Sequence, residues 1–214
     1  MDITWFGHAC CRLRDRNITI LTDPFDASTG YDLPRIRADV VTVSHPDPHH
    51  DHIQACKGEP FVIAGPGEYE LKGVFITGIP TFHDNKRGAL RGVNTVYLFE
   101  FDGLSVCHLG DLGHVPTQAQ VESLSHVDIL PVPVGGSQSL KAAEAAEVIG
   151  LLEPKIVIPI HYKTAQTTVT LETVNAFLKE VGVPAPEPIE MLKVTQSSLP
   201  EETQFVLLQP KQGT

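Results

Sequence analysis

The segment from Ser44 to His52 constrains this chain more than any other, because its nine residues include four histidines and two aspartates. It directly follows Val40–Val43, a β-branched run that is typical of a buried strand. Imidazole nitrogens and carboxylate oxygens are ligands that first-row divalent metals, and zinc in particular, take in proteins. The sequence therefore predicts a fold in which a buried strand ends at a metal site.

Length and composition indicate one globular domain spanning residues 1–214, in which a hydrophobic fraction of 42% is enough for a sizeable core. A formal net charge of −10 and a pI of about 5.4 argue against nucleic acid or an anionic membrane surface as a partner. The chain shows no basic leader, no apolar run of ~18 residues and no CxxC spacing among its four cysteines. We therefore expect a soluble cytoplasmic protein.

Short β-type runs separated by turn signals fill the first half of the chain, and helical patterns alternate with strands in the second half. Asp102-Gly103, between two such runs, is a strong hairpin signal. This order predicts an α/β fold of two sheets flanked by helices, a four-layer α/β/β/α sandwich, rather than one parallel wound sheet. The expected helices are Thr117–Leu124, Leu140–Leu152 and Leu171–Glu180, and the expected closing strands are Met191–Val194 and Phe205–Leu208.

Three further residues of types that bind metals follow predicted strands. His83 lies in Pro80-Thr81-Phe82-His83-Asp84, Asp111 in His108-Leu109-Gly110-Asp111, and His161 in Ile158-Pro159-Ile160-His161. Ligands at the ends of separate strands can meet at one rim of a sheet, where a rigid scaffold presents them. Each residue alone is a weak signal, but together they indicate a shared site with the Ser44–His52 loop.

Motifs along nearly the whole chain carry a family resemblance. They are Trp5-Phe6-Gly7-His8-Ala9, Leu21-Thr22-Asp23-Pro24, Gly65-Pro66-Gly67-Glu68-Tyr69, Pro80-Thr81-Phe82-His83-Asp84, His108-Leu109-Gly110-Asp111-Leu112-Gly113-His114, Pro133-Val134-Gly135-Gly136, Glu144-Ala145-Ala146 and Pro159-Ile160-His161-Tyr162. This set resembles the metallo-β-lactamase fold superfamily, and more narrowly its L-ascorbate-6-phosphate lactonase-like branch of metal-dependent hydrolases. The resemblance implies that Asp111 bridges two metal ions and that His83 and His161 complete the two sites.

The metal loop departs from the family pattern His-x-His-x-Asp-His. Read without a gap, the four slots hold His45, Asp47, His49 and His50; shifted by two, they hold Asp47, His49, Asp51 and His52. We favour the ungapped alignment, because Asp47 can cap a helix that Pro48 begins. Either alignment keeps histidine and carboxylate ligands for one or two divalent ions, with zinc, manganese and iron as the candidates.

These features predict a metal-dependent hydrolase, in which hydroxide held on the metal attacks a small ester, lactone or phosphoester. His8 and His114 match family motif positions near the site, where each can hold substrate or pass a proton. Asp23 is expected to accept the second N–H of a ligating imidazole. The expected partner is a small-molecule substrate, and a homo-oligomer of the chain is left open. The alternative is a metal-binding protein of the same fold that has lost or altered its catalysis.

Overall fold

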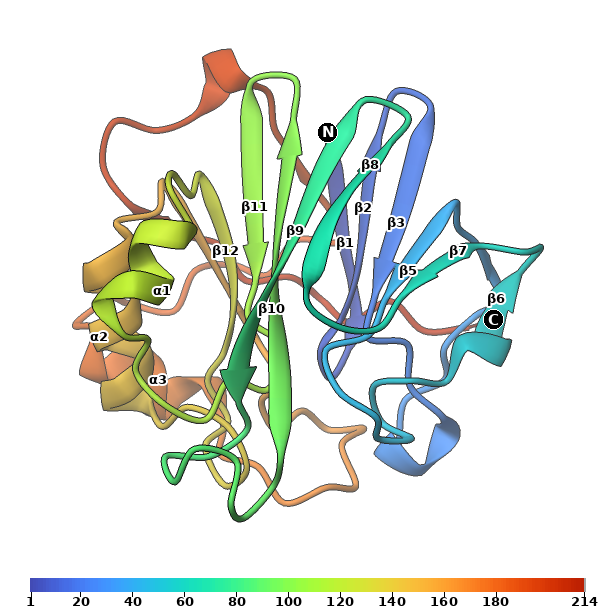
Figure 1. Cartoon of the computed structure of the whole chain (residues 1–214). Coiled ribbons are helices and arrows are strands. Elements are labelled where there is room, and N and C mark those ends of the chain that lie inside the picture. The colour runs from blue at the N-terminus through green and yellow to red at the C-terminus, as the bar shows by residue number, and fades with distance from the viewer. Residues whose placement is uncertain (214) are drawn as a thin grey trace.

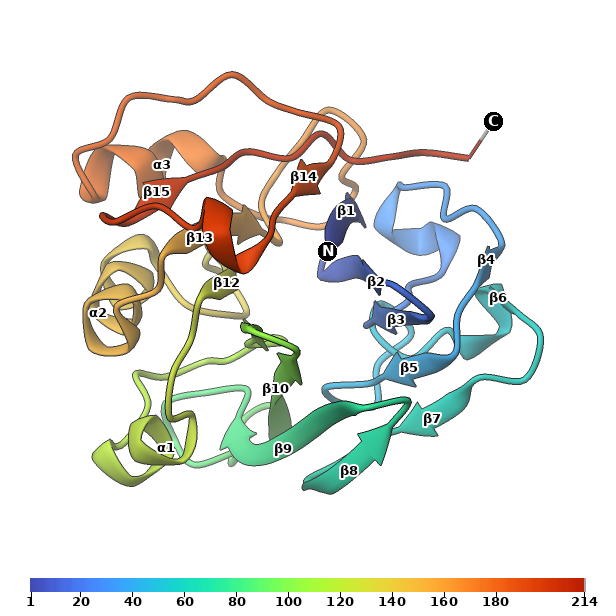
Figure 2. The same ribbon diagram turned by 90° about the horizontal axis from the view of Figure 1, so that it is seen from above.

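A computed structural model describes residues 1–213, in which two mixed β-sheets pack face to face (Figures 1 and 2). Sheet A has six strands in the order β14-β1-β2-β3-β5-β7. Strands β1 to β3 form an antiparallel meander, and β3, β5 and β7 run parallel to one another. The strands are β1 Asp2–Gly7, β2 Cys10–Asp15, β3 Ile18–Thr22, β5 Val40–Thr42, β7 Phe61–Ile63 and β14 Leu192–Lys193.

Sheet C has seven strands in the order β15-β13-β12-β11-β10-β9-β8. Its antiparallel half includes the expected hairpin, since β10 turns into β11 at Asp102-Gly103. Its other half, β11, β12, β13 and β15, is parallel. The strands are β8 Gly67–Leu71, β9 Val74–Phe82, β10 Val93–Phe101, β11 Leu104–His108, β12 Ile129–Pro133, β13 Ile156–Ile160 and β15 Gln204–Phe205; β4 Ile36–Arg37 and β6 Cys56–Lys57 form a separate ribbon.

The α-helices of the described residues all lie outside sheet C (Figure 2). They are α1 Gln118–Ser123, α2 Ala142–Leu152 and α3 Val174–Glu180. The third begins three residues later than expected, because Glu172 N–H donates to Gly135 O and Lys163 N–H donates to Glu172 O, which keeps the preceding segment extended. The outer layer of sheet A is built from irregular segments with 3₁₀ turns at Ala27–Thr29 and Ile53–Ala55. The four-layer order is therefore confirmed, with turns in place of α-helices on one side.

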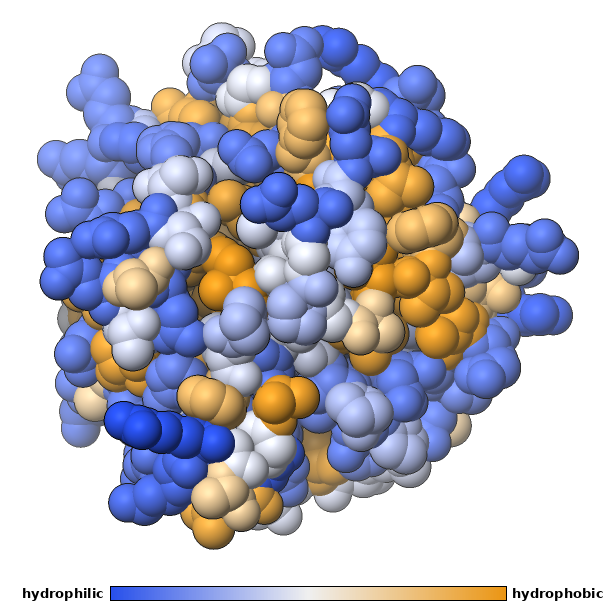
Figure 3. Space-filling view, viewed as in Figure 1, coloured by the Kyte–Doolittle hydropathy of each residue, from blue (hydrophilic) through white to orange (hydrophobic). Residues whose placement is uncertain are grey.

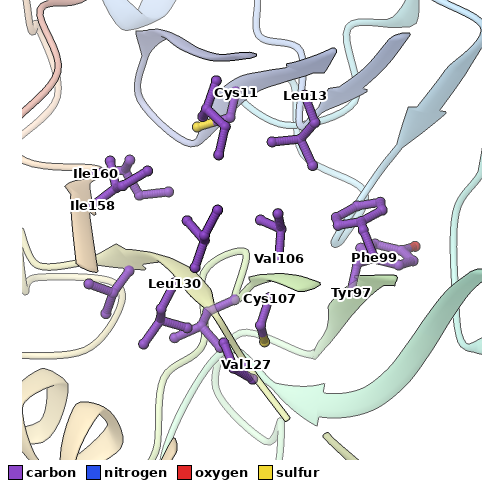
Figure 4. Packing of buried hydrophobic residues seen from close by; sticks show 14 of the residues in the cluster. Cys11, Leu13, Tyr97, Phe99, Val106, Cys107, Val127, Leu130, Ile158 and Ile160 are labelled. Atoms are coloured by element: carbon purple, nitrogen blue, oxygen red, sulfur yellow. The ribbon is translucent and has the colours of Figure 1, made fainter. Parts of the chain in front are cut away.

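The main core fills the space between the sheets. Cys11 and Leu13 of sheet A point toward Val106, Leu130 and Ile158 of sheet C (Figure 4). Along β2, Cys11 and Leu13 alternate with the more exposed Arg12 and Arg14, as expected for a strand with one buried face.

A second, smaller cluster lies under the irregular outer layer of sheet A. Phe6, Leu21 and Val41 on the sheet pack with Phe25 and Tyr31 of the covering loop. Some apolar side chains stay exposed. They gather on the right of the face shown in Figure 3, over β7 and β8, the edge strands of the two sheets. Phe61 of β7 is 50% exposed, and Phe75 of β9, the neighbour of β8, is 54% exposed.

Strand direction brings the predicted site together. Strands β1, β3 and β5 of sheet A and β9, β11 and β13 of sheet C each end just before a candidate site residue. The pairings make the first three run in one direction and the last three in one direction, and all six end at the lower edge of the molecule in Figure 1. Within residues 1–213, no helix is long and apolar enough to cross a membrane.

Candidate metal centre

Six side chains from the ends of five strands meet in one buried cluster. His8 follows β1, His45 and His50 lie on the loop after β5, His83 follows β9, Asp111 follows β11, and His161 follows β13. None is more than 7% exposed. They line a small cavity of about 20 Å³.

Asp111 is the centre of this cluster. Its Oδ2 atom lies 3.2 Å from His50 Nε2 and 3.4 Å from His83 Nε2, and its Oδ1 atom lies 3.4 Å from His161 Nε2. The carboxylate therefore faces histidines from both sheets. The left-handed Gly110 (φ 58°) and the bond from Asp111 N–H to Asn94 Oδ1 (2.9 Å) fix the turn that presents it.

A second layer of polar groups orients the imidazoles. Buried Asp23 accepts from Ser44 N (2.8 Å) and Ser44 Oγ (2.6 Å), and its Oδ2 lies 3.0 Å from His50 Nδ1. Ser44 Oγ also lies 3.0 Å from His45 Nδ1, and Ser139 Oγ lies 3.4 Å from His161 Nδ1. The Nδ1 atoms of His45, His50 and His161 thus each have a polar partner outside the cluster, which leaves their Nε2 atoms directed into it. This is the arrangement that usually orients histidine ligands of metals, and Asp23 has the position expected from the sequence.

Backbone conformation adds to this preorganisation. His8, Asp23 and His161 have φ values of 48°, 41° and 51°, in the left-handed region that non-glycine residues seldom occupy. Such conformations persist where the surrounding structure enforces them, and they gather at functional sites. Here His161 N–H donates to His8 O at 2.9 Å, which ties the two strained turns together.

Burial and charge set the protonation of the metal-free cluster. Burial lowers the pKa of His45 and of His161 to about 4, and it lowers the pKa of His8 well below its usual value. Burial also acts to lower the pKa of His50, but Asp111 and Asp23 outweigh it and raise that pKa to about 10. Near neutral pH, three of the rings are neutral and have a lone pair free, whereas a metal must displace a proton from His50.

The remaining loop residues stay outside the cluster. Asp47 Oδ1 accepts from His49 N–H at 2.9 Å, and the expected helix is a single turn in which His50 N–H donates to Asp47 O. The His49 ring points to Ser28 Oγ (2.9 Å), although Asp47 and His49 both reach the rim of the cavity. Asp51 and His52 do not line the cavity. The geometry therefore favours the ungapped alignment through His45 and His50.

His114, predicted as a catalytic residue, lies apart from the cavity. Its Nε2 accepts from Phe82 N–H at 3.3 Å and its Nδ1 lies 2.8 Å from Val115 O, so both ring nitrogens serve the turn between β9 and the Asp111 loop. The other wall of the cavity consists of Gln138 and Val169–Leu171, which were not predicted as site residues. No residue type there signals chemistry, so only the folded chain reveals this wall.

The donor atoms fit a divalent cation. Asp111 Oδ1 and His83 Nε2 are buried and have no hydrogen-bond partner among residues 1–213, and such buried polar atoms normally have one. Donor atoms within 4.8 Å of one another form two triads, His8, His50 and His161 on one side and His45, His83 and Asp111 on the other. Neutral imidazoles with a carboxylate between them suit zinc and its first-row neighbours.

Comparison with known proteins agrees with this geometry. Residues 2–161 match the family model described as a beta-lactamase superfamily domain. A UPF0173 metal-dependent hydrolase from Methanoregula boonei is 30% identical over 191 residues, covering 77% of this chain and 83% of the relative. A UPF0173 protein from Pyrococcus furiosus is 29% identical over 185 residues, covering 77% and 84%.

A crystal structure from Thermotoga maritima, described as a candidate Zn-dependent hydrolase of the metallo-β-lactamase superfamily, is also similar. It shares 43% sequence identity with a TM-score of 0.81, and the match covers 97% of each chain. The family match, the UPF0173 relatives and this fold agree with one another. The chain therefore belongs to the metallo-β-lactamase superfamily, within the UPF0173 group of metal-dependent hydrolases.

Proposed function

We propose that this protein is a metal-dependent hydrolase whose substrate is a small ester, lactone or phosphoester. The observation that carries this proposal is the position of Asp111, whose two carboxylate oxygens face histidines of both sheets at 3.2 to 3.4 Å. One carboxylate between two sets of imidazoles can hold two cations at a fixed spacing. The names of the UPF0173 relatives and of the Thermotoga maritima protein support the same chemistry.

Some of these residues would hold the metal ions, and others orient the residues that hold them. His45, His83 and Asp111 would hold one ion, and His50 and His161 would share Asp111 to hold a second. When bound, such ions supply a nucleophile from water at neutral pH and polarise the oxygen of the bond that is cleaved. Asp23, Ser44 and Ser139 keep the rings in orientation, and Val169–Leu171 line the other wall of the cavity.

The substrate proposal extends to lactones, phosphodiesters and phosphorylated sugar derivatives, as in the lactonase-like branch that the motifs resemble. Two bound dications would make the site attractive to an anionic group in spite of the net charge of −10. The second candidate function is a metal-binding protein without turnover. It is favoured by the small cavity of about 20 Å³.

Metal analysis separates these functions. Protein purified without chelator is expected to contain zinc, manganese or iron, and reconstituted protein is expected to hydrolyse generic phosphodiester or lactone substrates with added Mn²⁺ or Zn²⁺. Bound metal without turnover on any of these substrates would select the metal-binding protein. Absence of any bound metal after reconstitution would refute both functions.

The loop alignment gives a separate prediction. His50→Ala is expected to reduce metal affinity by about 10–100-fold, because His50 Nε2 contacts Asp111 while its Nδ1 is held by Asp23. His52→Ala is the matched change on the same loop and should leave metal content unchanged, since His52 does not line the cavity. Both variants can be measured by elemental analysis after dialysis. Loss of metal from His52→Ala, with His50→Ala unaffected, would support the alignment shifted by two.

A further inference from the structure

His8 is the one member of the buried cluster that neither the metal loop nor a strand of sheet C supplies. It comes from the turn between β1 and β2, two strands of sheet A. Its Nε2 atom nevertheless lies 3.2 Å from His50 Nε2 and 3.2 Å from His161 Nε2. Three imidazole nitrogens therefore point at one another in a buried site.

Hydrogen bonding alone does not account for this arrangement. A neutral imidazole carries a single N–H, so His8 Nε2 can donate to one of its two neighbours at most. The other ring nitrogen of His8, Nδ1, is buried and has no hydrogen-bond partner among residues 1–213. In either tautomer His8 Nε2 pairs with only one of its two neighbours, so hydrogen bonds leave one of these short contacts between ring nitrogens unexplained, whereas a cation would take the lone pairs of all three.

The spacing of the donors matches that of ligands around one tetrahedral ion. With metal–ligand distances of ~2.0–2.1 Å, neighbouring ligand atoms lie about 3.3 Å apart. The Nε2 atom of His8 has this spacing to the Nε2 atoms of His50 and of His161, at 3.2 Å each. Asp111 contacts the same two rings through different oxygens, Oδ2 at 3.2 Å from His50 Nε2 and Oδ1 at 3.4 Å from His161 Nε2. His8 thus completes a triad of imidazole donors with His50 and His161, and Asp111 lies beside the last two.

Asp47 and His49 of the metal loop do not take the place of His8 as a metal donor. The Asp47 carboxylate accepts from the backbone of its own turn, and the His49 ring points to Ser28. The exposed fractions of these two side chains are 44% and 30%, whereas His8 is 3% exposed. The chain also fixes His8 firmly, because His8 O accepts from His161 N–H and from Trp5 Nε1–H, each at 2.9 Å.

From these contacts we infer that His8 is a metal ligand, which binds through Nε2 and completes a second site with His50, His161 and Asp111. The inference rests on the proposed function, since it concerns the same pair of ions. This second site is held by three neutral imidazoles and one carboxylate, a nitrogen-rich set that favours zinc or cobalt over manganese. It also assigns to the β1–β2 turn a role in metal binding rather than in proton transfer.

Cobalt substitution tests the assignment without reference to activity. Each imidazole bound through Nε2 keeps an exchangeable Nδ1–H, whose proton NMR signal is strongly shifted by bound Co²⁺. The unmutated protein loaded with two Co²⁺ ions is expected to give five such signals, one for each histidine of the two triads. Four signals with two bound ions would overturn the assignment of His8 while leaving the proposed function intact, whereas failure to bind any ion would refute the proposed function itself.

Affinity measurements on variants add a second test. His8→Asn removes the imidazole but tolerates the left-handed φ of 48°. It is expected to lose one of the five signals and to weaken the binding of one Co²⁺ by about 10–100-fold, as measured by calorimetry. His49→Asn, on the loop, should keep all five signals and both affinities. Loss in His49→Asn with none in His8→Asn would overturn the inference.

Discussion

Asp111→Asn is expected to lower turnover by about 10³-fold or more, the largest effect of any single substitution in this protein. Both oxygens of Asp111 contact imidazoles from different strands, so an amide in this position loses one anionic donor and the negative charge that both ions share. The fold should survive, because Asp111 N–H still donates to Asn94 Oδ1 and the neighbouring backbone turn is unchanged.

The measurement compares kcat and bound metal in the variant and in the unmutated protein. Asp128→Asn is the matched control, since Asp128 is also a buried carboxylate and accepts from Ser105 N at 2.8 Å, but it lies at the start of β12, away from the cluster. That control should keep its turnover and lose only stability. Turnover that persists in Asp111→Asn would refute the two-metal mechanism.

Asp23→Asn is expected to have the second-largest effect, although Asp23 touches no ion in this arrangement. Its carboxylate joins the loop backbone at Ser44 to the ring of His50, and it is fully buried. An asparagine has one acceptor oxygen instead of two, so one of these contacts must be lost. We expect metal affinity to fall by about 10–100-fold and the free energy of unfolding of the metal-free protein to fall by about 2 kcal/mol.

Asn suits this position because it tolerates the φ of 41° at residue 23, so the variant changes the carboxylate without adding backbone strain. Asp51→Asn provides the control, as an aspartate of the metal loop that does not line the cavity. Thermal unfolding with and without metal, together with metal titration, measures both effects. Equal losses in the two variants would show that general loop stability, and not the contact with His50, decides metal affinity.

Much of the fold could be predicted from patterns with a local physical cause. Apolar and polar residues alternate in Cys11-Arg12-Leu13-Arg14, as in a strand with one face in the core, and in the structure Cys11 and Leu13 are buried. Asp102-Gly103 forms the expected hairpin, since glycine supplies the positive φ of 80° that the turn requires. The outer layer of sheet A was less predictable, because short 3₁₀ turns such as Ala27–Thr29 have no periodic pattern.

The sequence by itself determined the residue types of the site and the strand ends that carry them, since His83, Asp111 and His161 each follow a buried strand. Only the tertiary structure decided which donors meet. It turned His50 inward and His52 outward, and it brought His8 to within 3.2 Å of His161, which is 153 residues away in the chain. The physical reason is that ligand geometry depends on distances between strands and on the strained turns at their ends. Neither is encoded in a local pattern, and both follow from how the two sheets pack.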